Sequence, residues 1–142
     1  MKVLFAIRGI ANIGKSTTVK NVLAVLLARF PRGEWSVYKH RRGRKDILGV
    51  FTIDGVKIGI EAQGDVAEKL GNSLEQLMED GCEIIVCTDR SRRLDEQPVE
   101  DMEAYGFEIR IRPKNRQDGR DQTLAGEIVD EIEELLLGAA TG

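Results

Sequence analysis

Apolar positions along this chain follow two patterns, short strand-like runs and longer stretches with helical spacing. The strand-like runs lie at 2–8, 35–39, 47–53, 56–61, 83–87 and 107–112. Helical spacing is clearest in two sets between or after them, Val19, Val22, Leu23, Leu26, Leu27 and Phe30, and Leu124, Ile128, Ile132, Leu135 and Leu136. Strands that alternate with helices predict an α/β fold, a three-layer α/β/α sandwich with a mainly parallel sheet of about six strands.

One pair of strands departs from this alternation. Asp54-Gly55 separates the apolar runs 47–53 and 56–60, and Asp-Gly is a preferred two-residue turn of a β-hairpin. We therefore expect 47–53 to lie antiparallel beside 56–61, towards an edge, and the other strands to be parallel. A helix over 66–79, interrupted at Gly71, and a short helix over 98–105 complete the pattern. A chain of this length, 1–142, forms a single domain.

The junction between the first strand and the first helix carries the most specific chemistry. It reads Gly9-Ile10-Ala11-Asn12-Ile13-Gly14-Lys15-Ser16 and continues with Thr17. Gly9 and Gly14 permit a tight turn in which successive N–H groups point at phosphate oxygens, and the helix that begins near Lys15 adds the positive end of its dipole. Lys15 is expected to reach the β- and γ-phosphates, and the Ser16 hydroxyl to bind Mg²⁺.

This segment resembles the Walker A motif of P-loop nucleoside triphosphatases, and every position of the Gly-x-x-x-x-Gly-Lys-Ser pattern is matched. The resemblance covers the first 30 residues closely and the rest of the chain in outline. It implies a fold of the P-loop type in which residues 9–17 bind a nucleoside triphosphate together with Mg²⁺. A glycine-rich turn without a ligand is the alternative.

An acidic segment, Glu61-Ala62-Gln63-Gly64-Asp65, follows the apolar run 56–60. A carboxylate at the end of a strand downstream of such a loop can hold Mg²⁺ directly or through its waters. Glu61 is the first candidate and Asp65 the second, because Asp65 also suits a helix N-cap. The segment resembles the Asp-x-x-Gly switch of GTPases, with Glu61 in place of Asp, which implies that Gln63 orients an attacking water. A solvent-facing strand end is the alternative.

The apolar run 83–87 leads into Thr88-Asp89-Arg90-Ser91-Arg92-Arg93. Because ligands of open α/β sheets bind beyond the carboxyl ends of the strands, Arg90, Arg92 or Arg93 could meet phosphate charge as an arginine finger or a clamp. Asp89-Arg90-Ser91 also resembles the Asp/Glu-Arg-Ser motif of deoxynucleoside and thymidylate kinases, which implies that the acid and the arginine serve an acceptor nucleoside. Surface ion pairs with nearby acidic residues are the alternative.

Two polar loops supply further candidates. Loop 113–119 contains Lys114 and Asn115, where proteins of this outline often hold the base, but it lacks the Asn-Lys-x-Asp spacing that reads guanine in GTPases. We therefore expect ATP to be preferred to GTP. A surface turn is the alternative for this loop. Loop 39–45 holds five cations and His40 in seven residues. Such a loop suits an acidic or phosphorylated partner, or the far end of a nucleotide substrate, and a solvated loop is the alternative.

Composition and cysteine content indicate the class of protein and its cellular compartment. A net charge of −3 argues against a general nucleic-acid coat, and 42% hydrophobic with 32% charged residues is typical of a globular protein. Cys82 and Cys87 predict buried free thiols in a reducing compartment. No apolar stretch approaches the length of a membrane span. These features predict a cytoplasmic protein without a membrane partner.

Two functional hypotheses follow. The first is a Mg²⁺-dependent, ATP-preferring enzyme that transfers a phosphoryl group to water or to a small acceptor. Its catalytic candidates are Lys15, Glu61, Gln63, Asp89, Arg90 and Arg92. The second is a nucleotide-dependent binding switch with slow turnover that acts through a protein partner.

Overall fold

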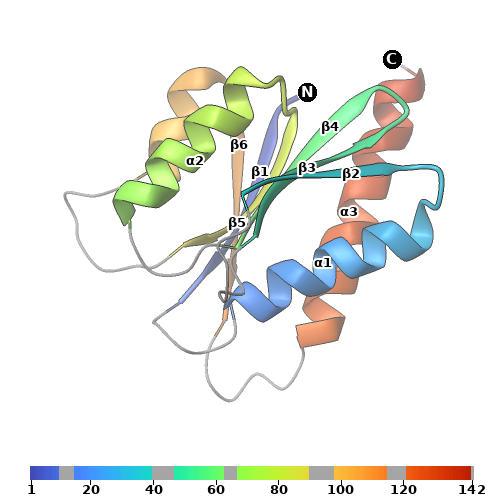
Figure 1. Ribbon diagram of the computed structural model, residues 1–142, viewed down its shortest axis with the longest axis horizontal. Helices are drawn as coiled ribbons and strands as arrows, with labels where there is room; N and C mark the ends of the chain where they lie inside the picture. Colours follow the sequence, from blue (N-terminus) through green and yellow to red (C-terminus); the bar gives the residue numbers. More distant parts are fainter. Residues whose placement is uncertain (10–14, 40–46, 63–66, 90–97, 115–120, 142) are drawn as a thin grey trace.

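The computed structural model describes residues 1–9, 15–39, 47–62, 67–89, 98–114 and 121–141. Its elements are β1 (Val3–Arg8), α1 (Lys15–Arg29), β2 (Glu34–Lys39), β3 (Ile47–Ile53), β4 (Val56–Ala62), α2 (Ala67–Glu79), β5 (Ile84–Asp89), the 3₁₀-helix η1 (Glu100–Tyr105), β6 (Glu108–Pro113) and α3 (Asp121–Thr141). This is the succession of strands and helices that the apolar pattern predicts (Figure 1).

Two of the predicted helices differ in detail. Helix α2 runs through Gly71 without an interruption. Leu70, Leu74 and Leu77 are all buried, and packing of this apolar face outweighs the roughly 1 kcal/mol that a glycine costs inside a helix. The expected helix over 98–105 is the shorter η1, and it ends at Gly106, whose φ of 92° is readily adopted by glycine.

The described strands form one sheet in the order β2-β3-β4-β5-β1-β6. Strands β4, β5, β1 and β6 are parallel neighbours, and β3 is antiparallel to β4 across a turn at Asp54 and Gly55, both with positive φ, which confirms the predicted hairpin. Strand β2 is joined to the sheet by its antiparallel pairing with β3 rather than by a parallel neighbour. The hairpin therefore does not form the edge of the sheet. Its outer strand, β3, forms backbone hydrogen bonds with β2, and β2 is the edge strand.

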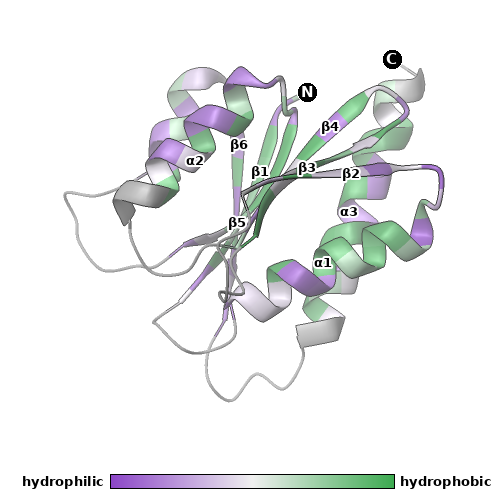
Figure 2. Ribbon diagram, viewed as in Figure 1, coloured by the Kyte–Doolittle hydropathy of each residue, from purple (hydrophilic) through white to green (hydrophobic). Residues whose placement is uncertain are grey.

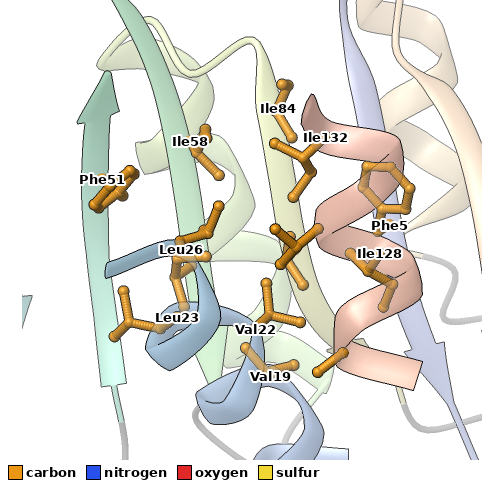
Figure 3. Close-up of a cluster of buried hydrophobic side chains, with 14 of the residues drawn as sticks. Phe5, Val19, Val22, Leu23, Leu26, Phe51, Ile58, Ile84, Ile128 and Ile132 are labelled. Carbon is orange, nitrogen blue, oxygen red and sulfur yellow. The ribbon is translucent and has the colours of Figure 1, made fainter. Parts of the chain in front are cut away.

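Helices cover both faces of the sheet. On one face, α1 and α3 bury a cluster that includes Phe5, Ile58 and Ile128 (Figure 3). On the other face, α2 and η1 bury a smaller cluster that includes Leu4, Leu74 and Met102. Figure 2 shows the hydrophobic strands between these two helical layers. Alternate residues of β1 thus point to opposite layers, which is the arrangement expected for a sheet that is buried on both sides.

The predicted burial and free state of the two cysteines are confirmed. Cys82 and Cys87 are buried and free. Among the described helices, none is long and apolar enough to cross a membrane.

Candidate functional site at the carboxyl edge of the sheet

The parallel strands bring four chain segments to one edge of the sheet. The carboxyl ends of β4, β5, β1 and β6 meet there, and α1 begins at the same edge with Lys15 (Figure 1). The chain leaves β1 for α1 on one face, whereas it leaves the neighbouring β5 for η1 on the other face. This divergence marks the topological switch point at which open α/β sheets usually bind ligands, and we refer to it as the β1–β5 crevice.

Lys15 lies at the first position of α1 and is 5% exposed. Its ammonium nitrogen Nζ donates to the backbone oxygen of Gly9 at 2.9 Å, and the Gly9 N–H donates to the backbone oxygen of Asp89 at 3.1 Å. Ser16 is partly buried and Thr17 is exposed in the same first turn. The two described ends of the glycine-rich segment (residues 9–16) are thus held together beside the end of β5.

Glu61 is 1% exposed and joins β4 to β5. Its Oε1 accepts hydrogen bonds from the Thr88 backbone N–H at 2.8 Å and from the Thr88 hydroxyl at 2.9 Å. The β4–β5 ladder ends one residue earlier, at Ile60 and Val86. The carboxylate therefore continues the connection between the two strands beyond the last backbone pair, which gives it a fixed orientation at the edge.

Asp89 is paired with a residue that no sequence motif marks. The Arg8 guanidinium donates from Nε to Oδ2 of Asp89 at 2.8 Å, and its Nη2 lies 2.7 Å from the same oxygen. Nη2 also contacts Glu100 of η1. Arg8 and Asp89 are register partners at the ends of β1 and β5. The only signal in the sequence is that each ends an apolar run, which does not reveal that these strands are neighbours.

Lys114 is 6% exposed, although the sequence places it in a polar loop. Its Nζ donates to the Thr18 hydroxyl of α1 at 3.0 Å, and its backbone N–H donates to the Arg8 oxygen at 2.9 Å. Lys114 therefore packs against the first turns of α1, so that two lysines, Lys15 and Lys114, are buried around the beginning of this helix. Positive charge at the positive end of a helix dipole favours anions.

The remaining candidates lie outside the described residues. They are Ile10, Ala11, Asn12, Ile13, Gly14, Gln63, Asp65, Arg90, Arg92 and Asn115, together with the basic loop except Lys39, which ends β2. The structure therefore gathers Gly9, Lys15, Ser16, Thr17, Glu61, Asp89 and Lys114 at one edge.

Acidic side chains lie near the Cys87 thiol of β5. Burial raises the pKa of the Cys87 thiol well above its usual value, and the nearby Glu61 and Asp89 raise it further. Within the described part of the chain, no group of three or more His, Cys, Asp or Glu side chains is arranged to hold a metal. The donor set of Ser16, Glu61 and Asp89 nevertheless consists of hard oxygen atoms, and Mg²⁺ uses one or two carboxylates and completes its shell with water and phosphate. These residues fit that ion chemically.

Comparison of the chain with protein-family models, with curated proteins and with solved structures finds no match.

Proposed function

We propose that this protein is an ATP-preferring, Mg²⁺-dependent nucleotide-binding protein of the P-loop type that performs phosphoryl transfer. The observation that supports this most strongly is the position of the glycine-rich segment. It joins a central parallel strand to the start of α1 at the β1–β5 crevice, with Lys15 buried at its end. A strand, a Gly-x-x-x-x-Gly-Lys-Ser segment and a helix in that order form the context that a phosphate cradle requires.

In this proposal each residue has a defined role. The N–H groups at the start of α1 and the Lys15 ammonium hold the β- and γ-phosphates and stabilise the charge that develops on them. Ser16 and Glu61 hold Mg²⁺, directly or through water, and the ion when bound neutralises phosphate charge. An arginine from 90–93 serves the acceptor, and Gln63 orients a water when water is the acceptor. The γ-phosphoryl group passes from ATP to water or to a small acceptor and leaves ADP.

A nucleotide-dependent switch with slow turnover is the second candidate. Glu61 favours it, because the same carboxylate that is proposed for Mg²⁺ also connects β4 to β5 through Thr88. A change at the metal would then alter the contact between two strands. The basic loop 39–45 would supply the surface for an acidic or phosphorylated protein partner. The chain lacks the guanine-reading Asn-Lys-x-Asp spacing, so ATP remains the expected nucleotide.

Thermal unfolding with Mg-ATP, Mg-GTP and the two diphosphates, each with and without metal, tests nucleotide binding. A ligand present at 100 times its dissociation constant adds about 2.7 kcal/mol to the free energy of unfolding. We expect the largest shift with Mg-ATP and a smaller one after Mg²⁺ is removed. A preference for GTP would favour the switch, and no shift with any nucleotide would refute the proposal.

Replacement of Lys15 by alanine tests the role of the cradle. The Lys15→Ala variant loses the cation beside the phosphates, and loss of a hydrogen bond to a charged group costs about 1.5–3 kcal/mol, or roughly 10- to 150-fold in affinity. Lys57→Ala is the matched control, because Lys57 is exposed near the start of β4, at the opposite edge of the sheet. Isothermal titration with Mg-ATP measures both. Wild-type affinity in a folded Lys15→Ala protein would contradict the assignment.

A further inference from the structure

Arg8 is the last residue of β1 and directly precedes the glycine-rich segment. We propose that Arg8 is a positioning residue of the phosphate site, which fixes the Asp89 carboxylate at the β1–β5 crevice so that it can hold the water shell of nucleotide-bound Mg²⁺. This inference rests on the proposed nucleotide-binding function. It adds a residue and a contact that the Gly-x-x-x-x-Gly-Lys-Ser pattern does not contain.

The contacts between the two side chains restrict the orientation of the carboxylate. Nε and Nη2 of Arg8 lie 2.8 and 2.7 Å from the same oxygen, Oδ2 of Asp89. Both of these contacts from Arg8 fall on one oxygen of the carboxylate. Two donors of a planar guanidinium on one oxygen leave the second oxygen, Oδ1, to take a water.

The backbone fixes the same pair relative to the glycine-rich segment. The Gly9 N–H donates to the Asp89 backbone oxygen at 3.1 Å, and the Arg8 oxygen accepts from the Lys114 N–H at 2.9 Å. Arg8 is therefore held between β5 and β6 by its main chain, while its side chain holds Asp89. Any shift of Arg8 would move the start of the glycine-rich segment and the carboxylate together.

The charge balance of this cluster suits a hydrated cation. The guanidinium of an arginine stays charged at neutral pH. Arg8 divides its charge between two carboxylates, Asp89 and Glu100. These three side chains alone, one cation and two carboxylates, carry a net charge of about −1. A fully neutralised Asp89 would attract the waters of Mg²⁺ less strongly.

The chain offers a matched arginine for comparison. Arg29 is 35% exposed in its side chain against 30% for Arg8, and it also lies beside two carboxylates, Asp130 at 2.7 Å and Glu133 at 3.5 Å. It occupies the last turn of α1, at the end of the helix opposite to Lys15. Arg29→Gln therefore removes a similar ion cluster without touching the crevice.

The experiment measures the dissociation constant of ATP by isothermal titration, once with Mg²⁺ and once with a chelator, for each folded variant. The ratio of the two constants gives the Mg²⁺ enhancement. We expect Arg8→Gln and Asp89→Asn each to reduce this enhancement by about tenfold or more, the usual cost of losing an outer-shell partner of a metal. The ratio removes any change that a variant makes in metal-free ATP affinity, and the enhancement of the double variant should match that of the single ones. Arg29→Gln should keep the wild-type enhancement.

A folded Arg8→Gln protein with the wild-type enhancement would overturn the proposal, as would losses that multiply in the double variant. If Arg8→Gln does not fold, Arg8→Lys decides the question. An ammonium keeps the charge but cannot place two fixed donors on Asp89, so we expect an intermediate enhancement, and a wild-type value would refute the role of the guanidinium. Absence of ATP binding by the wild-type protein would instead refute the proposed function itself, and this outcome is distinguishable from the others.

Discussion

The buried contact between Glu61 and Thr88 makes a specific prediction about stability. Thr88→Val keeps the shape of the side chain and the backbone N–H that binds Oε1 but removes the hydroxyl that donates at 2.9 Å. Glu61 and Thr88 are each 1% exposed, so water does not readily replace the missing donor. The variant should therefore unfold at a lower temperature than the wild-type protein.

The size of the effect follows from the charge of the acceptor. A hydrogen bond to an ionised group contributes about 1.5–3 kcal/mol, compared with about 1 kcal/mol for a neutral pair. For a chain of 142 residues, each kcal/mol lowers Tm by about 3–4 °C, so the expected decrease is roughly 5–10 °C. Thr88→Ser keeps the hydroxyl and loses one methyl group, and it should cost clearly less than Thr88→Val.

Circular dichroism melting of Thr88→Val, Thr88→Ser, Glu61→Ala and the double variant Thr88→Val/Glu61→Ala tests this reasoning. When Glu61 is absent, the Thr88 hydroxyl has lost its charged partner, and Thr88→Val should then cost little. The two single-variant effects should therefore be strongly non-additive. Equal melting temperatures for Thr88→Val and the wild-type protein, or additive effects in the double variant, would refute the assigned contact.

Two further predictions concern other parts of the fold. Burial and Asp80 raise the pKa of Cys82 to about 12, from 9.0 for a free thiol. The protonated thiol therefore makes its full contribution to the free energy of unfolding below pH 9. This contribution is lost as the pH rises towards 12. Melting against pH should show a weaker alkaline decrease for Cys82→Ala, and identical curves would contradict this. A Cβ at Gly33 would lie 2.1 Å from Cζ of Phe51, so Gly33→Ala should cost about 1–3 kcal/mol. Gly126→Ala, which enters open space within α3, should stabilise the protein by up to about 1 kcal/mol, and similar denaturation midpoints for both variants would refute the steric argument.

Local sequence signals predicted the elements because each signal acts over a few residues. Asp54-Gly55 specified the hairpin turn, and the continuous apolar run before Asp89 specified a buried parallel strand. Both follow from backbone geometry and from burial on two faces. Gly71 was misleading, because helix propensity is a weak local effect that the packing of α2 overrides.

The contacts of the site could not be predicted in the same way, since they depend on which strands become neighbours. Arg8 meets Asp89 only because β1 lies beside β5, although 81 residues separate them. The sequence places Lys114 in a polar loop, but its side chain is buried against Thr18, because β6 ends beside the first turns of α1. Such pairings are long-range consequences of strand order, and no spacing within the sequence encodes them directly.

The catalytic proposal and the switch proposal require different behaviour of the Glu61 carboxylate when Mg²⁺ binds. Both donors of Thr88 bind Oε1, so a metal that requires this oxygen must break two buried hydrogen bonds. A ligand can shift that arrangement only by its difference in affinity for the two states. Removal of the Thr88 hydroxyl would lower the cost of the shift, and Thr88→Val should then bind Mg-ATP more tightly than the wild-type protein. If the metal instead uses the other carboxylate oxygen, Thr88 serves as a fixed support, and the same variant should bind Mg-ATP equally well or more weakly. Tighter binding therefore favours a switch in which β4 and β5 change their contact, whereas equal or weaker binding favours a preorganised site for phosphoryl transfer.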